Sequence, residues 1–132
     1  MDKLGWHTLG TSFDCECGQR HALPIEACYV GEDADRQLAA FAQGRCGRTG
    51  LALSDENTRA AAGEGLFSHL GMKGARLKEE VLTGNGLDAT LARAEAVARV
   101  GEEVDFYVAI GSGTICDLAK YAAGQQEKPL LV

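Results

Sequence analysis

The strongest constraint on the fold of this chain is the regular alternation of short apolar runs with segments of helical periodicity. Each run is followed by a turn and then by apolar residues recurring every three or four positions. The expected strands cover residues 25–30, 49–53, 75–82, 106–110 and a last strand from residue 129, and the expected helices cover residues 33–42, 58–70, 88–100 and 114–123. Because strands joined through such helices form right-handed crossovers, the sequence predicts an α/β fold: a Rossmann-like, mostly parallel sheet with helices on both faces.

The first 24 residues follow a different pattern. Residues 11–17 alternate in character, and Gly18, Gln19 and Arg20 supply a turn before the next short run begins at His21. The sequence therefore predicts an N-terminal β-hairpin extension over residues 1–24, followed by one α/β domain over residues 25–132.

Composition and charge exclude several classes of function. The net charge is −6 and the basic residues are interleaved with acids or glycines, so nucleic acid is not expected as a partner. No apolar run approaches the roughly 18 residues of a membrane span. Five cysteines, an odd number, in a chain that begins without a signal segment favour the reducing cytoplasm. In this acidic chain an anion site would have to be built from backbone amides at a helix N-terminus.

The segment that follows the apolar run 106–110 is suited to such a site. Gly111, Ser112, Gly113 and Thr114 come directly before an expected helix. Glycines allow a sharp turn and a close approach to a ligand, while the first amides and the dipole of a helix attract phosphate. The segment lacks the third glycine of the dinucleotide fingerprint and the Gly-Lys-Ser/Thr of a Walker loop, so an ordinary tight turn is the alternative.

Three further charged residues lie where they could contribute to this site. Asp55, at the end of an expected strand, could accept hydrogen bonds from a ribose and repel a 2′-phosphate, or it could simply cap the following helix. Asp117 and Lys120 lie one turn apart after the glycine loop, where they could reach a substrate or form a solvated ion pair.

The cysteines raise two other possibilities, a metal site and a nucleophile. Cys15, Cys17 and His21 resemble half of a zinc site, but their spacing and the lack of a second ligand pair argue against structural zinc, and the sequence predicts no metal ligands. Cys116, near a helix N-terminus, would have its thiolate favoured there. A nucleophile also requires a base and an orienting group, and neither is evident in the sequence.

Residues 111–123, GSGTICDLAKYAA, resemble the glycine-rich segment of the sn-glycerol-1-phosphate dehydrogenases, a family within the iron-dependent alcohol dehydrogenase and dehydroquinate synthase superfamily. Residues 54–58, SDENT, are similar to the family's Asp-x-Asn-Thr turn. Residues 128–132, KPLLV, are similar to the strand before its Pro-Thr-Ala-x-Ser motif. The resemblance covers about residues 25–132 and implies that they form a dinucleotide-binding domain.

The resemblance also implies roles for individual residues. The cofactor, NAD or NADP, would be held by its phosphates and its adenosine ribose, and Asp117, with Lys120 one turn further along, would lie near the nicotinamide or the substrate. The implied cofactor-binding residues are Asp55, Gly111, Ser112, Gly113, Thr114 and Ile115. The implied reaction is reduction of dihydroxyacetone phosphate, a small phosphorylated substrate, to sn-glycerol 1-phosphate, assisted by a divalent metal, zinc or nickel.

Two departures from the family pattern qualify this expectation. The family's metal ligands, an aspartate and two histidines, belong to a helical domain downstream of residue 132, and His7, His21 and His69 do not match them. The isolated chain is therefore expected to be inactive, and further copies of the chain in a homo-oligomer are among the partners considered for the full-length enzyme. Cys116 stands where the family often has asparagine or histidine. The rival hypotheses are a glycerol or other alcohol dehydrogenase or a dehydroquinate synthase of the same superfamily, and a non-catalytic nucleotide-binding module.

Overall fold

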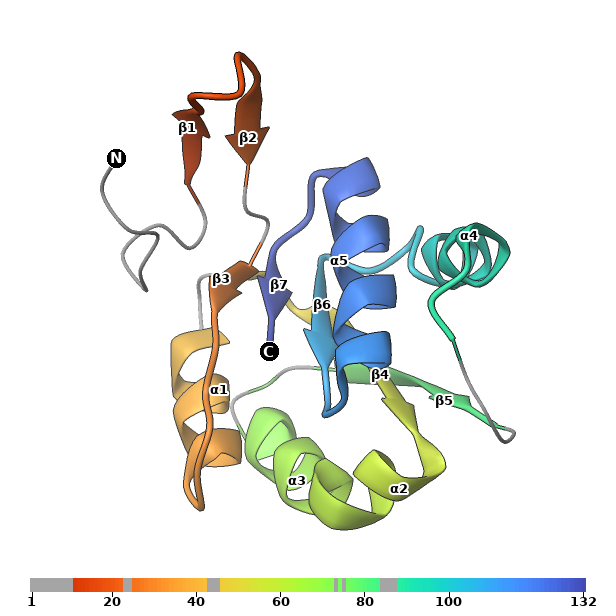
Figure 1. The fold of residues 1–132 in the computed structure, drawn as a ribbon. Helices are drawn as coiled ribbons and strands as arrows, with labels where there is room; N and C mark the ends of the chain where they lie inside the picture. Colours follow the sequence, from red (N-terminus) through yellow and green to blue (C-terminus); the bar gives the residue numbers. More distant parts are fainter. Residues whose placement is uncertain (1–10, 23–24, 43–45, 73, 75, 84–87) are drawn as a thin grey trace.

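The computed structural model describes residues 11–22, 25–42, 46–72, 74, 76–83 and 88–132 of the chain. An antiparallel hairpin comes first and is followed by an α/β unit (Figure 1). The strands are β1 (Ser12–Asp14), β2 (Arg20–Ala22), β3 (Ile25–Ala27), β4 (Thr49–Asp55), β5 (Arg76–Leu82), β6 (Phe106–Ala109) and β7 (Leu130–Leu131). The helices are α1 (Ala34–Ala42), α2 (Glu56–Thr58), α3 (Glu64–Met72), α4 (Leu91–Val100) and α5 (Gly113–Gln126), with a π-helical turn, Arg59–Gly63, between α2 and α3.

The α/β unit is built on a five-stranded sheet with the order β3-β7-β6-β4-β5, in which every neighbouring pair is parallel. Strand β6 lies at the centre and all four of its residues are buried. A strand covered on both faces needs a continuous apolar sequence, which explains why residues 106–110 do not alternate with polar residues. Strand β5, at one edge, carries Lys78, Glu79 and Glu80, and such charges discourage pairing with another chain.

Alternate residues of the central strands divide the core into two layers. Tyr107 and Ala109 pack on one face with α4 and α5, while Phe106 and Val108 pack on the other face with α1 and α3. Both faces are therefore covered, and the predicted fold, a Rossmann-like parallel sheet with helices on both sides after an N-terminal hairpin, is confirmed (Figure 1). No helix among the described residues is long and apolar enough to cross a membrane.

Several helix boundaries differ from the expected ones. The helix expected over residues 58–70 begins at Glu56, because Asp55 caps it, and it continues through the π-helical turn to Met72. Helix α4 begins at Leu91 and not near residue 88, and α5 continues to Gln126, beyond residue 123. Leu91 is 61% exposed, because the buried stripe of α4 is formed by Ala94 and Val97.

Candidate functional site

The glycine loop connects the buried strand β6 to the N-terminus of α5. Gly111 has φ +103°, a left-handed conformation that favours glycine. Ser112 then caps α5: its hydroxyl accepts a hydrogen bond from the amide of Ile115 at 3.5 Å, and its carbonyl accepts one from the amide of Cys116 at 3.0 Å. The amides of Gly113 and Thr114 precede these two and have no acceptor within the helix. They are the donors that a phosphate group could use.

The side chains of the loop divide between surface and core. An added Cβ at Gly113 would meet no other atom within 4 Å, so the space in front of the helix is open there. Ser112 is exposed, whereas the Ile115 side chain is fully buried among core residues of the α4 and α5 layer. Of the five loop residues expected to contact the cofactor, Ile115 therefore could do so through its backbone only.

Gly111 is in contact with the turn that follows the neighbouring strand β4. A Cβ built on Gly111 would lie 2.1 Å from Cγ2 of Thr58 and 2.6 Å from its Cβ. Strands β4 and β6 are adjacent and parallel, so their carboxyl ends lie at the same edge of the sheet. The chain leaves β4 toward β5 on one side and returns to β6 on the other, and open α/β sheets bind ligands at such a switch point.

Asp55 acts as the N-cap of α2. One oxygen, Oδ1, accepts a hydrogen bond from the amide of Thr58 at 2.8 Å, and the amide of Asp55 donates to the hydroxyl of Thr58 at 3.0 Å. This reciprocal pair is a capping box, which satisfies two backbone amides at once. The capping role considered from the sequence is thus present in the structure. It occupies Oδ1, and the half-buried carboxylate retains its second oxygen, Oδ2.

Asp117 and Lys120 form an ion pair on the exposed surface of α5. The Lys120 Nζ and an Asp117 carboxylate oxygen are 3.4 Å apart, and the two side chains are 51% and 60% exposed, respectively. An ion pair in this environment contributes little to stability, so both groups are free to change partners. Asp117 also lines a shallow pocket of about 350 Å³ with Thr90 of the α4 cap and Tyr121 of α5.

An apolar pocket of about 260 Å³ lies beside the glycine loop, on the face of the sheet covered by α1 and α3. Its floor is formed by the ends of the strands, including Ile110, Gly111 and Val132. Tyr29 and Leu66 contribute to its wall. A flat or apolar part of a ligand held at Gly111 would find a hydrophobic surface on this side of the loop.

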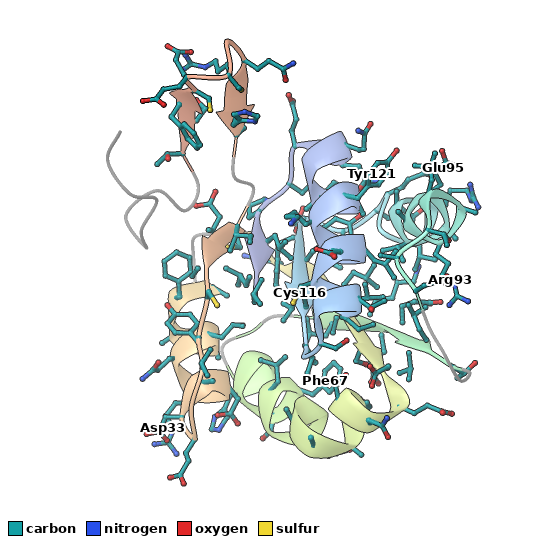
Figure 2. All side chains as sticks on the ribbon, in the orientation of Figure 1. Asp33, Phe67, Arg93, Glu95, Cys116 and Tyr121 are labelled. Carbon is teal, nitrogen blue, oxygen red and sulfur yellow. The ribbon has the colours of Figure 1, made fainter. Side chains whose placement is uncertain are left out.

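Cys116 lies on the first turns of α5 (Figure 2). Its thiol donates a hydrogen bond to the carbonyl of Gly111 at 3.3 Å and so helps to hold the loop. Burial, with smaller effects from Cys28 and Asp117, raises the pKa of the Cys116 thiol. A thiol with a raised pKa is a poor nucleophile, so the geometry favours a positioning role for Cys116.

The two described histidines lie in different parts of the molecule. His69 lies 3.7 Å from the carboxylate of Asp35 and connects α3 to α1. His21 lies with Cys15 and Cys17 at the hairpin, and their potential ligand atoms are all within 4.8 Å of one another. The cysteines were expected on a strand but lie in the turn, so the spacing argument against a metal site does not apply. His7 lies outside the described residues.

The chain is similar to known proteins over most of its length. The sequence profile of the iron-containing alcohol dehydrogenase family matches residues 29–132. Glycerol-1-phosphate dehydrogenase (NAD(P)+) of Bacillus velezensis is 29% identical over 127 residues, which cover 93% of this chain and 32% of the relative. The enzyme of the same name from Halalkalibacterium halodurans is 26% identical over 89% of this chain and 31% of its own length. The chain thus spans about a third of the length of the curated relatives it matches.

Solved structures share the fold at low sequence identity. Glycerol dehydrogenase from Schizosaccharomyces pombe superposes with a TM-score of 0.65 at 16% identity, covering 81% of this chain and 27% of that structure. The NADH-dependent butanol dehydrogenase A from Thermotoga maritima superposes with a TM-score of 0.62 at 18% identity, covering 76% of this chain and 25% of that structure. The named relatives confirm the resemblance of this chain to glycerol-1-phosphate dehydrogenases. Because the family profile matches most of its length, this chain belongs to the iron-containing alcohol dehydrogenase family.

Proposed function

We propose that this chain is the dinucleotide-binding part of a glycerol-1-phosphate dehydrogenase, an enzyme that reduces dihydroxyacetone phosphate to sn-glycerol 1-phosphate with NADH or NADPH. The observation that carries this proposal is the contact between Gly111 and Thr58, which joins the glycine loop to the turn capped by Asp55. A phosphate site and a carboxylate on adjacent strand ends match the two polar parts of an adenosine dinucleotide.

The loop would hold the pyrophosphate. The free amides of Gly113 and Thr114 and the positive end of α5 would face its oxygens, with Gly111, Ser112 and the backbone of Ile115 shaping the turn. Asp55 would accept hydrogen bonds from the adenosine ribose through the oxygen that the cap does not use. The rest of the dinucleotide would then extend toward β7 and the apolar pocket.

Asp117 and Lys120 would lie near the reacting end of the cofactor, one turn beyond the loop. The ammonium group of Lys120 could leave its exposed ion pair to contact the phosphate of the substrate. When bound, the dinucleotide supplies the hydride for carbonyl reduction. The contribution of this chain is to bind and orient it.

The described residues around the glycine loop do not fit the divalent metal that the family implies. Within the parts of the chain that the structure describes, Cys15, Cys17 and His21 form the one group of three potential ligands, and they belong to the hairpin. We therefore derive no metal-assisted step from this chain, and we expect it to bind the cofactor without catalysing turnover by itself.

Titration with NADH, followed by its fluorescence or by calorimetry, tests the cofactor proposal. The decisive variant is Gly113→Asp, which places a carboxylate in the open space before α5. An acid in the first turn suits the helix dipole, so the fold should be kept, while repulsion of the pyrophosphate should weaken binding by about 1–3 kcal/mol, or roughly 5- to 150-fold in Kd.

Gly113→Asn is the matched control, because asparagine has nearly the same shape without the charge. It should bind NADH several-fold more tightly than Gly113→Asp. Equal Kd values for the two variants, or no NADH binding by the wild-type chain, would contradict the proposed site. Binding of AMP as tight as that of NADH would instead favour a non-catalytic mononucleotide-binding module.

A further inference from the structure

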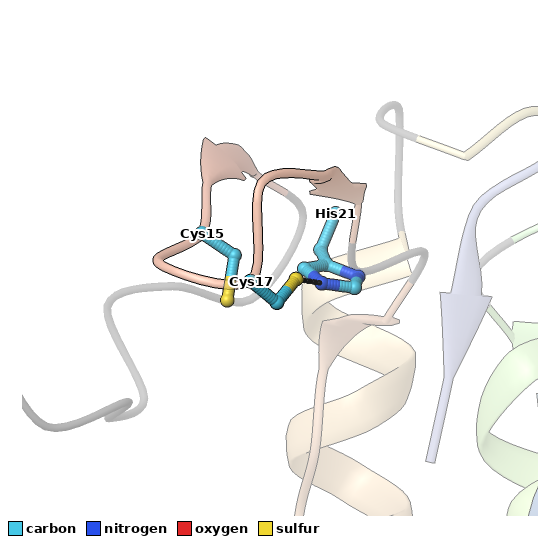
Figure 3. A group of neighbouring side chains, drawn as sticks. All are labelled: Cys15, Cys17 and His21. Carbon is cyan, nitrogen blue, oxygen red and sulfur yellow. Dashed lines mark hydrogen bonds between the residues drawn. The ribbon is translucent and has the colours of Figure 1, made fainter.

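The tip of the N-terminal hairpin gathers two thiols and an imidazole from one short segment. Cys15 and Cys17 lie in the turn between β1 and β2, and His21 lies in β2. Their side chains point toward one another (Figure 3). The Cys17 sulfur is 3.2 Å from Nε2 of His21, and all three potential ligand atoms lie within 4.8 Å of one another.

Backbone hydrogen bonds within the turn hold this arrangement. The amide of Cys15 donates to the carbonyl of Gln19 at 2.9 Å, and the amide of Gly18 donates to the carbonyl of Cys15 at 3.0 Å. Gly18 has φ +85°, which a side chain would disfavour, so the glycine lets the chain reverse directly after Cys17. The spacing Cys-x-Cys-Gly-x-x-His is therefore matched to the shape of the turn.

The pairing of the two strands orients the histidine. His21 is opposite Phe13 in the antiparallel register, and their ring centroids are 5.8 Å apart. Neighbouring residues of a strand point to opposite faces, so Arg20 faces away from His21. Arg20 is bonded there to Asp14 at 3.0 Å and to Ser12 at 3.1 Å. The guanidinium group is thus held on the face opposite His21.

Among the residues that the structure describes, the two strands of the hairpin bury few side chains. Each strand has three residues, and of these six only Phe13 is partly buried. An isolated two-stranded hairpin is marginally stable in water, and small units without a core commonly depend on a metal or a disulfide. None of the five cysteines that the structure describes forms a disulfide. The three clustered side chains are suited to supply the missing cross-link through a metal ion.

We propose that Cys15, Cys17 and His21 bind one zinc ion, which fixes the hairpin. Zinc prefers thiolate and imidazole ligands in a tetrahedral arrangement, in which neighbouring ligand atoms are about 3.5–3.8 Å apart. The ligand atoms are already near that spacing, so binding requires only small side-chain movements. The neutral imidazole donates Nε2, both thiols release their protons to solvent, and a water molecule completes the tetrahedron.

This site lies far from the proposed cofactor site. Figure 1 shows the hairpin beyond the amino ends of the parallel strands, whereas the loop after β6 lies at their carboxyl ends. The proposed zinc ion therefore belongs to the hairpin and not to the cofactor site. The inference does not depend on the proposed dinucleotide binding, and the two can fail independently.

Zinc content and cobalt spectroscopy of the 132-residue chain test the proposal. The protein purified under reducing conditions should hold one zinc ion per chain. After removal of zinc, Co²⁺ should produce thiolate charge-transfer bands and the intense visible bands of a tetrahedral site, and Zn²⁺ should abolish both. Cys17→Ser and His21→Gln should each weaken Zn²⁺ binding by more than about 100-fold, because loss of a direct ligand should exceed the usual cost of losing an outer-shell contact.

Cys28→Ser is the matched control, because it removes a half-buried thiol outside the cluster and should leave the stoichiometry and the cobalt spectrum unchanged. Zinc should also slow amide hydrogen exchange in residues 12–22 of the wild type and not in Cys17→Ser. The proposal is overturned by an absence of Co²⁺ or Zn²⁺ binding to the reduced protein, by equal binding to Cys17→Ser and Cys28→Ser, or by a Cys15–Cys17 disulfide detected as a mass lower by two hydrogens.

Discussion

Gly111 and Thr58 lie in contact across the carboxyl ends of β6 and β4, so close that a Cβ on Gly111 would be 2.1 Å from the Thr58 methyl group. Thr58 is itself fixed by its reciprocal hydrogen bonds with Asp55. The glycine loop, the Asp55 turn and the start of α2 therefore form one connected unit. Changes to any of these residues should affect the whole unit.

Gly111→Ala should destabilise the fold, whereas Gly113→Ala should not. Gly111 combines a left-handed φ with the close contact to Thr58, and a strained backbone of this kind costs about 1–3 kcal/mol before the overlap is counted. At Gly113 the added methyl group points into open space at a helix start. The free energy of unfolding in urea measures both effects, and equal values for the two variants would refute the contact.

Asp55 variants should separate its capping role from its proposed role in ribose binding. Asp55→Ala removes the cap and should cost about 1 kcal/mol, while Asp55→Ser keeps a capping hydroxyl and should retain most of that stability. Asp55→Ser also removes the carboxylate that would repel a 2′-phosphate. For Asp55→Ser, the ratio of the Kd for NADPH to the Kd for NADH should therefore be lower than for the wild type. An unchanged ratio would exclude Asp55 from the ribose site.

Stability should fall in alkali because of Tyr107. Its side chain is fully buried, and its hydroxyl donates to Oε1 of Gln126 at 2.5 Å. Burial, with a smaller contribution from the charge on Glu102, raises the pKa of Tyr107 to about 12, above the value of about 10 for an unfolded chain. As the pH rises, Tyr107 therefore loses its proton in the unfolded state before it does so in the folded state. The contribution of the protonated hydroxyl to the free energy of unfolding is complete below about pH 10 and declines as the pH rises toward about 12.

Tyr107→Phe is the control for this pH dependence. It should be less stable than the wild type at neutral pH by about 1–3 kcal/mol, because Gln126 loses a partner in a partly buried position. Its unfolding free energy should then fall less steeply between pH 10 and 12. If the unfolding free energies of the two proteins fell equally steeply between pH 10 and 12, Tyr107 would not titrate as its environment implies.

Asp105 should contribute to stability at neutral pH and lose that contribution in acid. Its Oδ2 accepts hydrogen bonds from the amide of Thr49, the first residue of β4, at 3.1 Å and from the amide of Arg48 at 3.0 Å. These bonds lower the pKa of the Asp105 carboxyl, so its stabilising effect is present above the usual carboxyl range and is lost as the pH falls through the lower folded value.

Asp105→Ala should lower the urea midpoint at pH 7 and flatten the acid side of the stability profile. Asp105→Asn can still accept from one amide and should fall between the alanine variant and the wild type. A profile for Asp105→Ala as steep as that of the wild type would show that other carboxyl groups cause the acid dependence.

Local patterns were sufficient for the elements and for their order. The uninterrupted apolar run 106–110 predicted a strand buried on both faces, and the structure places β6 at the centre of the sheet. The helix expected over residues 114–123 is present as α5, and its Ile115, Leu118 and Ala122 are buried. Such features depend on residues close in sequence, whose periodicity reflects which side of an element avoids water.

Contacts between distant segments were decided by the tertiary structure alone. The sequence placed Asp55 and Gly111 on neighbouring strands but could not show that Thr58 would press against Gly111, because that distance depends on how β4 and β6 pack. It likewise suggested that Cys15 and Cys17 lie on a strand apart from His21, whereas the tight turn at Gly18 brings all three together. The spacing of apolar residues determines which helices and strands this protein forms, and the packing and turns between those elements determine which side chains meet.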